Sequence, residues 1–240
     1  MPVCGAIDSW RQMAVASRRS AFTFWLAWVA AAAVGAALAA TASFPTPAYE
    51  SPGGLGVWIS APLLAAPAAL LQFVVLRALL HASPGTAGLW FVVTLLAAAL
   101  IAPATMVWYL GVIRILGGSS TFTGDGVSWS VDPRWADFAV AAPEYIAPVL
   151  LGIAQGVVLV RVFGRLGAVA IWLAANVVAF IVAGRLTGLA LAQTYFEVRW
   201  PSGYVVTMTL FGALFGAVTG AALVALMRWR LAPAPIPVAA

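Results

Sequence analysis

Six apolar segments of membrane-spanning length constrain the fold of this chain more than any other feature. They cover residues 21–42, 57–80, 88–112, 141–162, 167–188 and 204–227. About 20 apolar residues in a helix that rises 1.5 Å per residue cross the ~30 Å hydrocarbon core of a bilayer. Only 8% of the residues are charged, whereas a soluble domain carries about 25% to cover its surface. The sequence therefore predicts an all-α integral membrane protein, a single membrane domain of six transmembrane helices.

The first segment also has features of a secretory signal peptide, because arginines precede it and the small residues Ala40-Thr41-Ala42 end it. Its apolar run is nevertheless longer than a signal-peptide core of about 7–15 residues. We expect it to be the first transmembrane helix.

The charges outside the segments predict the orientation. One side carries eight arginines: Arg11, Arg18, Arg19, Arg77, Arg161, Arg165, Arg228 and Arg230. The other side carries only three arginines, Arg114, Arg134 and Arg199, and six carboxylates: Glu50, Asp125, Asp132, Asp137, Glu144 and Glu197. Cytoplasmic ends of membrane proteins are enriched in Arg and Lys. We therefore expect a multi-pass protein of the bacterial inner membrane, with both termini cytoplasmic and an extracytoplasmic loop over residues 113–140.

A short pattern occurs three times and predicts internal repetition. Gly152-Ile-Ala-Gln-Gly-Val-Val-Leu-Val-Arg161 has a fainter copy around Gln72, 83 residues earlier, and another around Thr219, 64 residues later. Each copy is the last part of an inward-running segment that ends near an arginine. The spacing predicts three helical hairpins that run in the same direction, as a parallel repeat.

Tryptophans mark the outward-running segments of these hairpins. Trp90 and Trp172 stand near the starts of the third and fifth segments, and Trp28 holds a similar place in the first. Tryptophan is enriched at membrane interfaces. We therefore expect Trp90, together with Trp25 and Trp229, at the inner interface.

The repeated pattern, each copy followed by a tryptophan-led helix, resembles uncharacterised bacterial multi-pass membrane proteins. Those proteins carry tandem hairpins with a Gly-x-x-Gln-Trp-x-x-Leu-Arg signature. The resemblance covers residues 57–228, and Phe73 and Gly156 stand where the signature has tryptophan. It implies a multi-pass fold and no particular activity.

Five polar residues inside the segments form what we call the polar layer. Its members are Gln72, Thr94, Gln155, Asn176 and Thr219. Counted from the inner ends of their segments, they lie about 7–14 Å deep, in the inner leaflet. One interpretation is a set of interhelical hydrogen bonds, in which the two glutamines share partners including Thr94 and Asn176. The other is a binding pocket open to the cytoplasm.

Two further patterns have structural interpretations. Glycines recur every four residues in the fourth and sixth segments, which is typical of close helix–helix packing. These glycines, here called the glycine strips, are Gly152 and Gly156, and Gly212, Gly216 and Gly220. Arg185 lies near the outer end of the fifth segment. It either extends its side chain to the outer interface or forms an ion pair with Glu144.

The loop over residues 113–140 is longer than a connection requires. Thr121–Val131 alternates around a Gly-Asp-Gly turn and predicts a β-hairpin. Pro133–Ala142 predicts a short interfacial helix that carries Trp135 and Phe138. Loops of this kind commonly carry binding sites. We expect partner subunits to bind here or on the glycine strips.

The scarcity of reactive side chains argues against an enzyme. The chain has no lysine, one cysteine (Cys4) and one histidine (His81), so a catalytic triad or a metal site with several His or Cys ligands cannot be assembled. The arginines lie at segment ends, so we expect membrane lipid and no nucleic acid as a contact. We expect no catalytic residue, metal ligand or cofactor. The sequence favours a non-enzymatic structural or accessory subunit of a membrane complex, and the alternative is a small transporter or channel that uses the polar layer.

Overall fold

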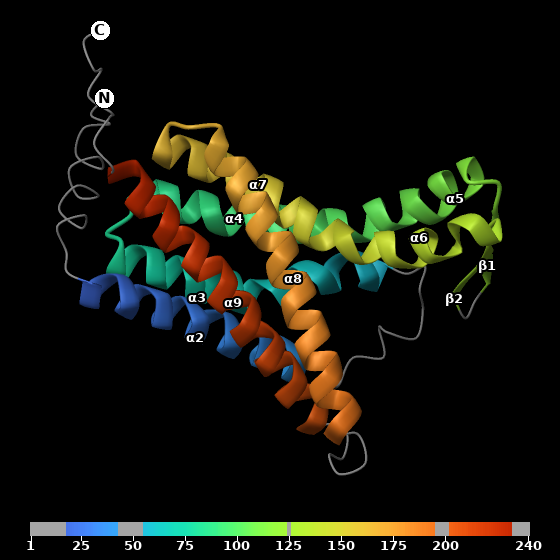
Figure 1. The fold of residues 1–240 in the computed structure, drawn as a ribbon, viewed down its shortest axis with the longest axis horizontal. Helices are drawn as coiled ribbons and strands as arrows, with labels where there is room; N and C mark the ends of the chain where they lie inside the picture. The colour runs from blue at the N-terminus through green and yellow to red at the C-terminus, as the bar shows by residue number, and fades with distance from the viewer. Residues whose placement is uncertain (1–17, 43–54, 124–125, 195–201, 232–240) are drawn as a thin grey trace, which may run out of the picture.

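The computed structural model of the chain describes residues 18–42, 55–123, 126–194 and 202–231 (Figure 1). Within these ranges lie six helices that are long and apolar enough to cross a membrane. They are α2 (Arg18–Ala42), α3 (Leu55–Leu79), α4 (Pro84–Val107), α7 (Ile146–Phe163), α8 (Gly167–Thr194) and α9 (Ser202–Leu231). The prediction of an all-α fold with six membrane-length helices is confirmed.

The six helices pack as a closed ring. Each helix contacts the next one along the chain, and α9 returns to pack against α2. The start of α2, the end of α9 and the turns that join α3 to α4 and α7 to α8 all lie at the left end of Figure 1. We call this end of the bundle the turn end. The three-hairpin repeat remains a prediction from the sequence.

Helix α4 begins earlier than the sequence predicted. The predicted span starts at residue 88, whereas the helix starts at Pro84. The hydroxyl of Ser83 accepts a hydrogen bond from the Thr86 backbone N–H at 3.2 Å and caps the first turn. Proline is well suited to the first helical position, where its missing N–H costs nothing.

Helix α7 begins later than predicted. The predicted span starts at residue 141, but residues Ala142–Tyr145 form the 3₁₀ segment η4 and the α-helix starts only at Ile146. Its C-terminus is sharp, because Gly164 has a φ of 68° and takes the left-handed cap conformation that glycine adopts without strain.

The largest buried side chains gather at the turn end. Trp28, Trp90 and Trp172 are each buried to 99% or more, and Val158 and Leu226 pack with them in the same cluster. The outward-facing surfaces of the six helices expose many leucines and valines instead. Such an exposed apolar surface suits contact with lipid, as expected for a protein embedded in a membrane.

A smaller unit, here called the hairpin arm, lies at the opposite end from the turns (Figure 1). It comprises the π-helical segment η2 (Trp108–Val112), α5 (Ile113–Ile115), strands β1 (Ser119–Thr123) and β2 (Gly126–Ser130), the 3₁₀ segment η3 (Pro133–Trp135) and α6 (Ala136–Ala141). The strands pair antiparallel, with Ser119 opposite Ser130. The predicted hairpin is confirmed, and η3, α6 and η4 occupy the predicted short helix.

Aromatic contacts hold the hairpin arm together. The Trp108 indole N–H donates to the carbonyl of Ala139 at 3.3 Å, and the Trp108 and Phe138 rings meet edge to face with centroids 5.4 Å apart. Asp132 caps the following turn by accepting from the backbone N–H and the guanidinium of Arg134. These two bonds, the guanidinium bond foremost, lower the pKa of Asp132.

Candidate functional site

The five members of the polar layer are buried in the bundle, with exposed fractions between 1% and 8%. They come from five different helices, α3, α4, α7, α8 and α9. A buried amide or hydroxyl without a hydrogen bond is costly, and lipid offers none. The partners of these groups therefore determine what the layer does.

Three tryptophan indoles supply hydrogen bonds to the layer. Trp90 donates to the Gln72 carboxamide oxygen and Trp172 to that of Gln155, each at 3.1 Å. Trp28 donates to the Thr219 hydroxyl at 3.1 Å. Each bond joins a residue of the repeated pattern to an indole on the helix beside it.

These bonds pair the helices differently from the predicted hairpins. The sequence grouped each outward helix with the inward helix that follows it. The indole bonds instead link an inward helix to the outward helix that comes after it, α3 to α4 and α7 to α8. The third pair is α9 with α2, the last long helix and the first.

The three indoles also contact one another. The Trp28 and Trp90 centroids lie 5.7 Å apart and those of Trp90 and Trp172 5.6 Å apart, both edge to face. The expectation that Trp90 marks the inner interface is wrong, because only 1% of the residue is exposed. Its N–H has an acceptor within the bundle and does not need the headgroups.

Gln155 connects two indole-bonded pairs. Its carboxamide oxygen accepts from Trp172 while its Nε2 donates to the Thr94 hydroxyl at 3.0 Å. Thr94 in turn donates to the Trp90 carbonyl at 2.8 Å. A chain of hydrogen bonds thus runs from α8 through α7 to α4. Gln155 has the expected partner in Thr94, whereas Gln72 bonds to Trp90.

Asn176 is only partly satisfied. Its Nδ2 donates to the Trp172 carbonyl one turn earlier, at 2.9 Å. Its Oδ1 is buried and has no hydrogen-bond partner among the described residues. Native structures leave few such groups unpaired.

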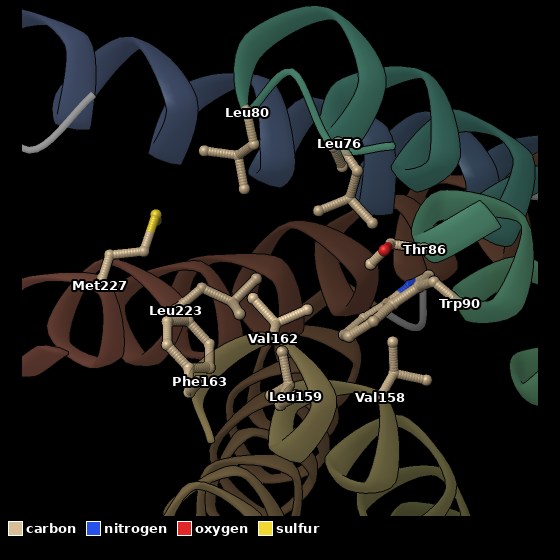
Figure 2. Close-up of a pocket in the computed structure, with 11 residues that line it drawn as sticks. Leu76, Leu80, Thr86, Trp90, Val158, Leu159, Val162, Phe163, Leu223 and Met227 are labelled. Carbon is tan, nitrogen blue, oxygen red and sulfur yellow. The ribbon is translucent and has the colours of Figure 1, made fainter. Parts of the chain in front are cut away.

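An apolar cavity of about 20 Å³ lies beside Trp90 at the turn end (Figure 2). Its walls include Leu76, Leu159 and Leu223, each one helical turn after a member of the polar layer. A volume of this size holds one water molecule, and an apolar lining offers that water few partners. The polar layer itself does not line the cavity.

The glycine strip of α9 faces α2. A Cβ placed on Gly216 would lie 2.7 Å from the Ala32 Cβ, and one placed on Gly212 would lie 2.5 Å from the Ala32 carbonyl oxygen. Gly220 would meet the Trp28 ring at 3.0 Å. Larger side chains at these positions would push α9 away from α2. Helix α2 of the same chain therefore already covers this strip.

The glycine strip of α7 faces α8 in the same way. A Cβ on Gly152 would lie 2.8 Å from the Leu173 side chain, and one on Gly156 would lie 3.0 Å from Val169. The two strips therefore hold the ring together internally. The expectation that another subunit packs on them is corrected, because α2 and α8 occupy them.

Arg185 and Glu144 are not brought together. Both residues are exposed, one on α8 and the other on η4, and no ion pair joins them. Extension of the Arg185 side chain to the outer interface remains a prediction. The ion pair found among the described residues joins Arg134 to Asp132 in the hairpin arm, at 2.7 Å.

The described ranges contain no candidate metal site. No cluster of three or more His, Cys, Asp or Glu side chains occurs there. His81 lies in the turn between α3 and α4 with a φ of 46°, and Cys4 falls outside the described residues.

No family model, curated protein or solved structure matches this chain.

Sequence reasoning identified all five members of the polar layer but missed the three indoles that bind them. A usable signal was present. Gln72 precedes Trp90 by 18 residues and Gln155 precedes Trp172 by 17, each across one tight turn. In an antiparallel helix pair, residues at similar distances before and after a short turn lie at the same depth.

Proposed function

We propose that this protein is a non-enzymatic structural or accessory subunit of a complex in the bacterial inner membrane. The observation that carries the proposal is that the polar layer is bonded to the core of the protein itself. Gln72, Gln155 and Thr219 each accept an indole N–H, and Gln155 also binds Thr94. Groups engaged in this way stabilise the bundle.

The centre of the ring supports the same proposal. Trp28, Trp90 and Trp172 meet edge to face, and the cavity beside them has room for a single water molecule. Sites for small organic ligands usually measure about 300–1,000 Å³. A transporter built on this layer would have to separate the indoles before a solute could reach it.

The alternative, a small transporter or channel, has one specific observation in its favour. Asn176 Oδ1 is a buried acceptor without a partner in the described chain. An acceptor of this kind is suited to a ligand that enters the layer. Loss of transport in a folded Asn176→Leu variant would favour this alternative over an accessory role.

The hairpin arm is the surface on which we expect a partner to dock. Ile115 is 82% exposed, Phe138 51% and Trp135 46%, and the two aromatic rings contact each other with centroids 6.4 Å apart. Aromatic side chains are enriched at protein interfaces. The glycine strips offer no comparable surface, since helices of the same chain cover them.

The orientation supports an extracytoplasmic partner. The arginine-rich segment ends lie at the turn end, and the hairpin arm lies at the other end of the bundle. By the positive-inside rule the turn end, and with it both termini, would face the cytoplasm. The arm would then meet its partner at the outer surface, with lipid around the helices.

Site-specific photo-crosslinking in cells tests this proposal. A photoreactive residue at Ile115 should give a discrete adduct with a second protein, and Trp135→Glu should abolish it. Leu166, 80% exposed in the turn between α7 and α8, provides the matched control at the other end of the bundle. Adducts of equal yield from both positions, or adducts with lipid alone from Ile115, would refute docking on the arm.

A further inference from the structure

At the contact between α4 and α7, a hydrogen bond joins two members of the polar layer. Gln155 occupies the repeated polar position on α7. It accepts from an indole through Oε1 and donates through Nε2 to Thr94 on α4, four residues after Trp90. One carboxamide thus satisfies two groups on two neighbouring helices.

The equivalent positions on α8 and α9 carry similar polar residues but lack one hydrogen-bond donor. Asn176 stands four residues after Trp172, in the place of Thr94, and Thr219 stands in the place of Gln155. Thr219 accepts from Trp28 but donates its own proton to the Phe215 carbonyl at 2.9 Å. A hydroxyl has one proton, so Thr219 has none for Asn176.

The geometry points to a binding site for one small neutral O–H donor at Asn176 Oδ1, at the position on α8 that is equivalent to Thr94 on α4. Asn176 is 99% buried and its Oδ1 is unpartnered, while its Nδ2 donates to the Trp172 carbonyl, which fixes the carboxamide with Oδ1 as the free atom. The side chain of Thr219 is smaller than that of the glutamine at the equivalent position, and the difference in volume is comparable with a water molecule.

The chemistry of the ligand follows from the surroundings. A cation would be buried among apolar helices without a counter-charge, which is far more costly than burying a neutral donor. The donor is therefore water or a hydroxyl group of a lipid or detergent. Both would donate one hydrogen bond to Oδ1.

Asn176 is the only asparagine in the chain, so asparagine labelled with ¹³C at its side-chain carbonyl and ¹⁵N at its side-chain amide reports on this side chain alone. We would measure the isotope-edited infrared stretch of its carbonyl and the cross-relaxation between its NH₂ protons and water. The key variant is Thr219→Gln. It should keep an acceptor for Trp28 and donate to Asn176, as Gln155 does to Thr94.

In the wild type we expect a carbonyl frequency as low as in Thr219→Gln, together with a water cross-peak that the variant loses. Thr219→Ser, which keeps the hydroxyl and the space, should retain the cross-peak. A low frequency in both lauryldimethylamine oxide and dodecyl maltoside identifies water. A low frequency in the maltoside alone identifies a hydroxyl from the amphiphile.

A wild-type carbonyl that absorbs at a higher frequency than in Thr219→Gln in both detergents would overturn the proposal, because the oxygen would then be unbonded. The same conclusion follows if the cross-peak survives unchanged in Thr219→Gln. Should that variant fail to accumulate, a wild-type frequency that is typical of an unbonded carbonyl in both detergents refutes the site by itself.

Discussion

Replacing Gln155 by leucine tests how much the polar layer contributes to stability. The side chain makes two hydrogen bonds, to the Trp172 indole and to the Thr94 hydroxyl. Leucine has a similar volume and removes both. The Trp172 N–H is then left in the core without an acceptor, whereas Thr94 keeps its bond to the Trp90 carbonyl.

The expected cost follows from these two losses. A stranded buried donor costs about 1–3 kcal/mol, and an interhelical hydrogen bond in a membrane protein contributes about 0.6–2 kcal/mol. Together they predict a loss of about 1.6–5 kcal/mol. For a chain of this size the melting temperature should fall by about 2–4 °C per kcal/mol.

The assay is thermal unfolding in detergent, followed by circular dichroism, in a double-mutant cycle with Trp172→Phe. The double variant removes both partners of one bond, so it should be less destabilised than the sum of the single variants by about 0.6–2 kcal/mol. Val157→Leu, on the exposed face of the same helix, serves as the control and should change stability by less than about 0.5 kcal/mol. Additivity within about 0.3–0.5 kcal/mol would refute the reasoning, because it would mean that the bond contributes nothing.

Two further predictions concern packing and orientation. Gly216→Leu should lower the melting temperature markedly, because overpacking costs about 1–3 kcal/mol and the neighbouring atoms belong to the α2 backbone and to Ala32. Ala221→Leu, exposed on the same helix, should have little effect, and equal effects would mean that the close approach is unimportant. In intact cells, impermeant thiol reagents should label Ser130→Cys on the hairpin arm and leave Cys4 unlabelled. Labelling of Cys4 from outside would reverse the orientation inferred from the arginines.

The membrane helices were predictable because their signal is a sum over many residues. About 20 apolar side chains in a row cannot be placed in water, whatever each one contacts. The ends of helices depend on single groups instead. The cap by Ser83 and the change from 3₁₀ to α geometry at Ile146 moved two boundaries by four and five residues.

The polar layer was predictable in membership and not in connectivity. Each of its residues stands out because it is polar within an apolar run. Its partners do not stand out, because an indole is apolar enough to belong anywhere in a membrane helix and is common at interfaces. Placing Trp90 in the core required knowing that the turn between α3 and α4 brings it level with Gln72.

The contact between α2 and α9 illustrates why the fold needs specific polar bonds as well as apolar helices. In lipid, apolar surfaces gain little from meeting one another, so close packing and hydrogen bonds must choose the partners. Short turns bring α3 beside α4 and α7 beside α8, but no such turn joins α2 to α9. This contact is closely packed through Gly212 and Gly216 and has indole bonds from Trp28 and from Trp25, whose N–H donates to the Ala217 carbonyl at 2.9 Å. Helices α2 and α9 are not joined by a turn, so small residues and two hydrogen bonds hold them together. Their contact closes the ring.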